Sequence, residues 1–319
     1  METLINVSLP IFVIMAMGYG AGHWKLLGED AALSLNRFVL LFALPPAMFV
    51  FTARADIDDI LNGPFITAFL LGSLATAIVA LLVARYVFRL NLQETTLHGF
   101  LSVFTNSGYM GIPLFMAAFG PDNILPAIII TTVGPMMFIA VVMFAMELMR
   151  APDKPLLGRL LVVALTLMKS PMLMASVLGA VFSWYAIPLP VSIGRVLDLL
   201  ASSSGPVALF ALGLSLIGHT LLGDLAEIFW ISILKVIVQP LLTFLCVTYV
   251  FYMEPFWAQS AVILAALPIG STAFVVAQQY DVAVRRAGKV RNLSSHRLQN
   301  MSDLCAVPEL AALIICWWN

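Results

Sequence analysis

The chain has 319 residues, of which 61% are hydrophobic and 10% charged. Soluble domains carry about 25% charged residues, so this composition excludes a soluble protein and predicts an integral membrane protein. The formal net charge of −1 excludes the basic surface that nucleic-acid binding requires. The three cysteines have no spacing typical of a metal site or of a disulfide framework. We therefore expect no metal and no cofactor.

Apolar stretches long enough to cross a hydrocarbon core of about 30 Å recur along the whole chain. They are continuous rather than alternating, which favours helices over a membrane β-barrel. The expected fold is an all-α polytopic membrane protein with ten transmembrane helices. In chain order, the ten predicted spans are residues 4–22, 31–53, 64–87, 95–119, 124–149, 161–183, 196–218, 226–251, 256–280 and 302–318.

Basic residues in the connections between these spans predict the orientation of the chain, because cytoplasmic connections are enriched in lysine and arginine. If the N-terminus is outside, the outside connections contain only Arg54 and Arg195. This bias predicts that both termini are outside. The inside connections would contain Lys25, Arg85, Arg89, Arg150, Lys154, Arg159, Arg285, Arg286, Lys289, Arg291 and Arg297.

A short basic connection, residues 150–160, divides the spans five and five. It is predicted to be a cytoplasmic linker between a first five-helix repeat (1–149) and a second one (161–319). An odd number of helices per repeat makes the second repeat run opposite to the first, as in many secondary carriers. Internal echoes support this plan: LPPAMF (44–49) corresponds to SGPVALF (204–210), and NSGYMGIP (106–113) corresponds to LPIGSTAF (267–274).

The fourth and ninth spans are interrupted at similar depths. At ~1.5 Å per residue, Asn106 lies roughly 16 Å beyond Thr95 and Pro268 roughly 18 Å beyond Phe256, so both breaks are near the membrane midplane. Proline suits the first turn of a helix, so each break predicts a new helix N-terminus, with Pro113 beginning one of them. Helix N-termini attract anions. The candidate substrate-binding residues are Asn106, Ser107, Gly108, Tyr109, Pro113, Pro268, Gly270, Ser271 and Thr272.

Ionisable residues inside spans are costly and therefore functional candidates. Lys235 and Lys169 are predicted to serve ion coupling or to support the breaks, and structural pairing is an equal alternative for both. Gln278 is a further candidate, two turns beyond the break in the ninth span. His98 and His219 lie near span ends, which argues against a proton relay.

Four segments resemble signature segments of the auxin efflux carrier family: LNRFVLLFALPPAMF (35–49), FTNSGYMGIPLF (104–115), LKVIVQPLL (234–242) and LPIGSTAFVVAQQY (267–280). This family includes plant auxin exporters and bacterial permeases for malate or malonate. The resemblance implies two inverted five-helix repeats, with helices 4 and 9 crossing at their prolines around the substrate. It also implies a scaffold domain of helices 1, 2, 6 and 7, a mobile transport domain, a homodimer, and a location in the bacterial inner membrane.

The resemblance ends near Arg286. From about Gly288 the chain is polar and then apolar, with interruptions at Asp303, Pro308 and Glu309. We interpret this tail as altered, for example by a frameshift, which would leave helix 10 short or distorted.

The sequence thus predicts a secondary transporter that moves a small organic anion, a mono- or dicarboxylate of malate, malonate or auxin type, across the bilayer. Coupling to a proton or sodium gradient and uniport are both open; the spans contain no obvious cluster of acidic ligands for sodium, which favours proton coupling or uniport. The nearest alternative is a sodium-coupled bile-acid-type symporter, and a channel is a weaker one. An enzyme is not expected, since no HExxH or GxSxG motif occurs.

Overall fold

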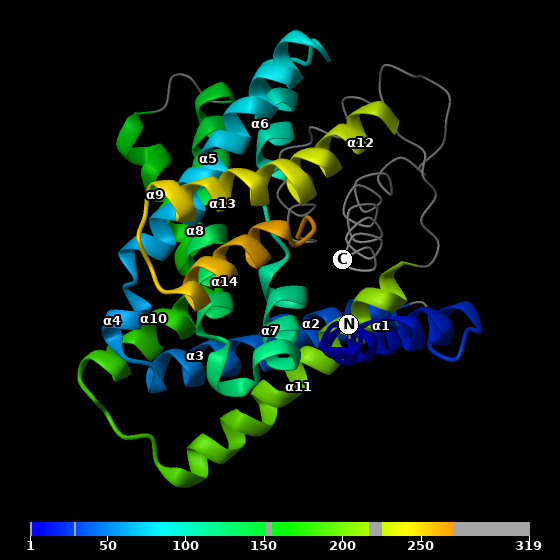
Figure 1. The fold of residues 1–319 in the computed structure, drawn as a ribbon, viewed down its shortest axis with the longest axis vertical. Helices are drawn as coiled ribbons and strands as arrows, with labels where there is room; N and C mark the ends of the chain where they lie inside the picture. Colours follow the sequence, from blue (N-terminus) through cyan, green and yellow to red (C-terminus); the bar gives the residue numbers. More distant parts are fainter. Residues whose placement is uncertain (1, 29, 151–154, 217–224, 271–319) are drawn as a thin grey trace. The chain divides into compact units, whose positions relative to one another are not determined.

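The computed structural model describes residues 2–28, 30–150, 155–216 and 225–270, and throughout these ranges the chain is helical, with no strand longer than a single bridge (Figure 1). The predicted tenth span, the altered tail, and the candidates Ser271, Thr272 and Gln278 lie outside the described residues, as does His219.

The N-terminal half of the chain contributes the following elements: α1 (Glu2–His23), α2 (Ala31–Phe38), η1 (Val39–Ala43), α3 (Leu44–Arg54), α4 (Ile57–Ile60), α5 (Gly63–Tyr86), α6 (Leu92–Leu101), η2 (Ser107–Gly111), α7 (Ile112–Phe119), η3 (Pro121–Asn123) and α8 (Leu125–Arg150). The second half contributes α9 (Leu156–Met168), α10 (Pro171–Trp184), α11 (Val191–Ser215), α12 (Leu225–Ile233), η4 (Leu234–Val238), α13 (Gln239–Tyr249) and α14 (Pro255–Ala266).

Several of these helices are long and apolar enough to cross a membrane, which supports an integral membrane protein. They number five in the described part of the chain: 31–54, 57–86, 121–149, 191–215 and 229–249. A sixth results if α9 and α10 are one span. The remaining apolar helices there are shorter. The full count of ten spans therefore stays a prediction.

One predicted span differs from the structure. Residues 161–183 were expected to form one continuous helix, but α9 and α10 meet at an angle of 78°. The hydroxyl of Ser170 accepts a hydrogen bond from the Leu173 N–H at 3.4 Å, and Pro171 begins the next helix. A side-chain cap followed by proline is a helix start, so these residues divide the span.

Three π-helical turns each end two residues before a proline. Sequence reasoning did not predict them. η1 is followed two residues later by Pro45, η2 by Pro113 and η4 by Pro240. Proline lacks an N–H and its ring clashes with the preceding turn of an α-helix. A wider turn just before the proline relieves that clash, and π-helical turns are frequent at functional sites.

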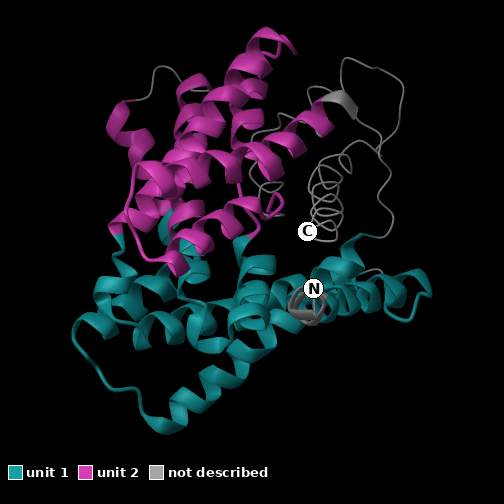
Figure 2. Ribbon diagram, viewed as in Figure 1, with its two compact units in different colours: residues 1–62, 107–132, 167–218 teal, residues 63–106, 133–166, 219–319 magenta. Residues whose placement is uncertain are grey.

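Residues of the chain group into two compact units (Figure 2). Unit 1 contains residues 1–62, 107–132 and 167–218, and unit 2 contains 63–106, 133–166 and 219–319. The first unit holds α1, α2, α3, α10 and α11, from predicted helices 1, 2, 6 and 7 of the expected scaffold domain. It also holds η2, α7 and the first residues of α8, from predicted helices 4 and 5, which are not part of that expected domain. The repeat boundaries stay a prediction, because each unit draws on both halves of the chain.

Within unit 1, α1 and α11 pack at backbone contact distance. Gly213 of α11 lies against the Met15 backbone, and Gly18 of α1 lies against the Phe210 carbonyl. Small residues allow such close approach between membrane helices. The apolar cluster beside them consists of Ile11, Met15, Leu209 and Leu212.

Replacing Gly213 with alanine is expected to destabilise unit 1 by about 1–3 kcal/mol, as overpacking does. A Cβ at this position would lie 2.7 Å from the Met15 carbonyl carbon, and backbone atoms cannot rotate away. The midpoint of thermal unfolding in detergent measures the effect. Gly158→Ala is the control, since its nearest neighbour would be Pro155 Cγ at 3.7 Å. Equal midpoints for the two variants would contradict the packing described.

In unit 2, α5 packs against α13 and α14. Gly72 of α5 lies against the Thr243 backbone, where an added Cβ would be 2.8 Å from Thr243 Cα. The Phe65 and Trp257 rings meet edge to face, with centroids 5.0 Å apart. This packing fixes the position of α14, and with it the start of the break at Leu267, against α5.

Candidate functional site

Two helices of unit 2 end where the sequence predicted breaks. α6 ends at Leu101, and α14 ends at Ala266. Leu267 has an extended conformation (φ −62°, ψ 148°), as expected of a residue before proline. Pro268 has no N–H to continue the helical ladder. The backbone N–H and C=O groups after each helix can therefore form hydrogen bonds outside the helix.

The two broken segments pair with each other. Thr105 and Ile269 form an antiparallel bridge. The Asn106 N–H donates to the Pro268 carbonyl at 2.8 Å, and the Gly270 N–H donates to the Phe104 carbonyl at 3.1 Å. Residues 104–106 and 268–270 thus form a short backbone pairing. It supplies hydrogen-bond partners for N–H and C=O groups that lie beyond the ends of the two helices and so have no partner within a helix.

Side chains cap the C-terminal end of α14, whose last carbonyls have no partner within the helix. The Thr105 hydroxyl donates to the Leu264 carbonyl at 2.9 Å. Lys235 Nζ donates to the Ala265 carbonyl at 2.8 Å. The end of one broken helix is thus held by a residue of the other break and by a lysine from η4.

Lys235 heads a chain of buried polar groups. Its Nζ also donates to Gln239 Oε1 at 2.6 Å. The Gln239 amide donates to Ser73 Oγ at 2.8 Å and, at 3.5 Å, to the Val103 carbonyl. Lys235, Gln239 and Ser73 are each 0% exposed. Sequence reasoning singled out Lys235 but could not name its partners, because Ala265 and the residues that contact Gln239 are distant in the chain.

The candidates of the fourth span divide between the two units. Asn106 is buried in unit 2, while Ser107, Gly108, Tyr109 and Pro113 belong to unit 1. The Tyr109 hydroxyl donates to the Asn36 carbonyl at 3.3 Å, so that group is already engaged within unit 1. Gly108 faces Thr131, whose Cγ2 would lie 3.3 Å from an added Cβ.

The restart of the helix lies earlier than the sequence indicated. Pro113 was expected to begin the second half-helix, but η2 begins at Ser107 and continues into α7 through Gly111, which has helical angles (φ −64°, ψ −51°). Pro113 instead packs beside Gly205 of α11. The N-terminal end of this half-helix is therefore at Ser107, directly after Asn106.

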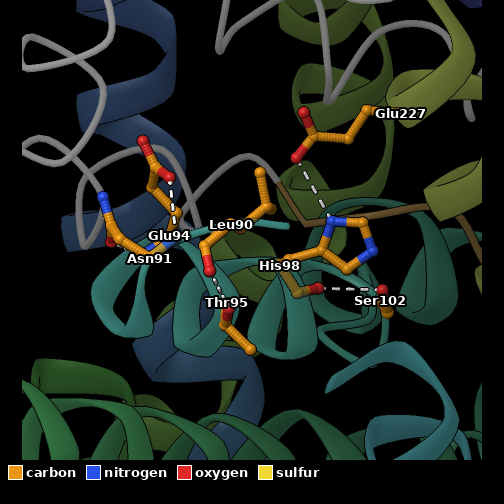
Figure 3. A network of polar contacts seen from close by, with 7 residues as sticks. All are labelled: Leu90, Asn91, Glu94, Thr95, His98, Ser102 and Glu227. Atoms are coloured by element: carbon orange, nitrogen blue, oxygen red, sulfur yellow. Dashed lines mark hydrogen bonds and ion pairs between the residues drawn. The ribbon is translucent and has the colours of Figure 1, made fainter. Parts of the chain in front are cut away.

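His98 is buried and paired. It is 1% exposed, and its Nδ1 lies 3.2 Å from Glu227 Oε1 (Figure 3). α6 begins with a capping box between Asn91 and Glu94, and the Ser102 hydroxyl donates to the His98 carbonyl at 2.8 Å. The 129 residues between His98 and Glu227 hid this pair from sequence reasoning.

Two other features belong to unit 1. Lys169 lies in the bend between α9 and α10 with an exposed side chain. A cavity of about 520 Å³ in unit 1 is lined by residues of the α3 end and the α11 start, including Arg54, Arg195 and Asp198. Arg54 and Asp198 form a two-pronged ion pair at 2.8 and 2.9 Å. None of the candidate substrate-binding residues that the structure describes lines this cavity.

Comparison with known proteins identifies the family. The model of the membrane transport protein family matches residues 3–294. The chain belongs to this family. Its members similar to this chain include a Rhizobium meliloti protein whose name proposes malonate transport, 30% identical over 90% of both chains. The uncharacterised Escherichia coli transporter YfdV is 25% identical over 88% of this chain and 90% of its own.

A plant relative matches a smaller part of the chain. Auxin efflux carrier component 4 of Arabidopsis thaliana is 30% identical over 119 residues, which are 37% of this chain and 19% of the plant protein. These matches confirm the resemblance to auxin efflux carriers that the four signature segments indicated.

Proposed function

We propose that this membrane transport protein is a secondary transporter that carries a small organic anion by alternating access around the paired breaks of α6 and α14. The observation that carries the proposal is the backbone pairing of residues 104–106 with 268–270. Non-helical backbone at membrane depth is tolerated only where it is buried in protein or lines a water-filled cavity. Carriers place their substrate sites at such broken helices.

The chemistry of the breaks favours an anion. Neither 105–113 nor 267–274 contains an aspartate or glutamate, so no carboxylate there repels a negative substrate. A half-helix begins at Ser107, and helix N-termini carry roughly half a positive charge. In this proposal the anion contacts Asn106, Ser107, Gly108, Tyr109, Pro113, Pro268, Gly270, Ser271 and Thr272.

The finer architecture is part of the same proposal. The ten helices form two inverted five-helix repeats, 1–149 and 161–319, and helices 4 and 9 cross at their prolines. Both termini are outside, the protein resides in a bacterial inner membrane, and two copies form a homodimer.

Malonate and related dicarboxylates are the first substrates to test, since a relative of 30% identity carries malonate in its name. Purified protein in proteoliposomes is expected to take up radiolabelled malonate, with a rate that saturates and is reduced by unlabelled malate or succinate. Protein-free liposomes are the control. Indole-3-acetate is the competitor that tests an auxin-like substrate.

Two outcomes would replace this proposal. A flux that rises linearly with concentration and does not saturate would indicate a channel. Uptake that requires sodium and prefers bile acids would indicate a bile-acid-type symporter. Absence of uptake of every mono- and dicarboxylate tested, by protein that is folded and inserted, would contradict an organic-anion transporter.

A further inference from the structure

Lys235 presents a charge problem that the proposed site does not explain. Its side chain is 0% exposed, and in the part of the chain that the structure describes no carboxylate forms an ion pair with it. A buried ammonium is strongly destabilised unless nearby groups compensate for the lost hydration. The groups in contact with Nζ are two oxygens, the Ala265 carbonyl and the Gln239 amide oxygen.

Both oxygens are suited to a cation. The Ala265 carbonyl belongs to the last turn of α14, and a helix C-terminus carries roughly half a negative charge. The orientation of the Gln239 amide follows from its surroundings: its nitrogen donates to Ser73 Oγ, which itself donates to the Phe69 carbonyl at 2.8 Å. Gln239 therefore turns its oxygen toward Nζ, and the network as a whole offers acceptors to one positive charge.

The place of this charge is informative. In carriers with broken helices, the C-terminal ends of half-helices and unwound backbone carbonyls are the groups that hold a coupling cation. Here the end of α14 is such an end, directly before the paired residues 268–270. Lys235, in the π-helical turn η4, already places its Nζ at this helix end. The residues around Nζ, Gln239 and Ser73, are also 0% exposed.

We propose that the ammonium group of Lys235 is a resident cation that takes the place of a coupling ion at the C-terminal end of α14. Lys235 is then a positioning residue: it neutralises this helix end and holds the break in its paired form throughout the transport cycle. For the transporter proposed above, on which this part rests, the consequence is that carboxylate flux does not depend on sodium.

The first test uses the unaltered protein. The midpoint of thermal unfolding in detergent and the malonate flux in proteoliposomes are measured in sodium chloride and in choline chloride at equal ionic strength. Equal values in both salts are expected. A midpoint that rises specifically with sodium, or a flux that requires it, would overturn the proposal. The thermal measurement needs no substrate, so it decides on Lys235 even if no carboxylate is transported.

The second test restores the cation from solution. Lys235→Ala removes the ammonium and leaves space between the Ala265 and Gln239 oxygens, so methylammonium at neutral pH is expected to raise its unfolding midpoint by about 2–4 °C. Lys235→Met fills the same space with an apolar chain, and its midpoint should not respond. Lys169→Ala, an exposed lysine on another helix pair, should behave as the unaltered protein does.

The same variants can refute the idea. If methylammonium stabilises Lys235→Ala no more than Lys235→Met, the site does not require a cation. If Lys235→Met unfolds at the same temperature as the unaltered protein, the ammonium does not stabilise the end of α14. If Lys235→Ala cannot be purified in folded form, the sodium comparison on the unaltered protein still supports or overturns the proposal.

Discussion

Asn106→Asp is expected to reduce carboxylate uptake by about 100-fold, the largest loss we expect from a substitution that hardly changes side-chain volume. Two unit charges about 4 Å apart repel by roughly 1 kcal/mol in bulk water and roughly 4 kcal/mol at an effective dielectric constant of 20. A loss of about 2.8 kcal/mol corresponds to a factor of 100. Asn106 is 3% exposed, so the new carboxylate would be poorly screened by water.

The control for charge alone is Asn123→Asp, which adds the same carboxylate on the exposed turn η3 and should leave uptake near its original rate. Asn106→Ala separates charge from hydrogen bonding, and an intermediate loss of about tenfold is expected, since a hydrogen bond to a charged group contributes about 1.5–3 kcal/mol. Uptake by Asn106→Asp at the original rate, in protein with an unchanged unfolding midpoint, would remove Asn106 from the substrate site.

The sequence located the breaks because their signals are local. Proline within an apolar run predicts the end of a helix whatever surrounds it. Counting residues from the start of each predicted span placed Asn106 and Pro268 at similar distances along their helices. In the structure these two residues share a backbone hydrogen bond. Rise per residue is a property of the helix itself, so the similar distances of Asn106 and Pro268 from their helix starts could be derived without tertiary information, while their depth in the membrane stays a prediction.

The missed features depend on contacts between distant segments or on backbone geometry that composition does not reveal. Ser107, rather than Pro113, begins the half-helix because the turn before the proline is π-helical. The pairing of His98 was not anticipated, because its partner Glu227 comes from another helix. For Lys235, both alternatives were left open, and only the folded chain brings its ammonium to the Ala265 carbonyl. Burial of a polar group needs a partner, and one sequence cannot name it.

Gly270→Ala tests whether the pairing of the two breaks, rather than the breaks themselves, is what transport requires. An added Cβ would lie 2.8 Å from Phe104 Cε1 and 3.1 Å from the Thr105 carbonyl oxygen. Phe104 is 3% exposed and its ring packs on Phe100 at 4.8 Å, so it cannot move aside freely. We expect uptake to fall by about tenfold and stability by about 1–3 kcal/mol, as overpacking does.

A control and a rescue make this result specific. Gly63→Ala, where an added Cβ meets nothing within 4 Å, should leave both uptake and the unfolding midpoint unchanged. Phe104→Val removes the ring atoms that the new methyl group would strike, so the double variant should transport better than the two single effects predict. Such non-additivity is the signature of residues in contact. Additive losses would mean that Gly270 acts elsewhere, and the pairing of 104–106 with 268–270 would then not be the element that positions the substrate.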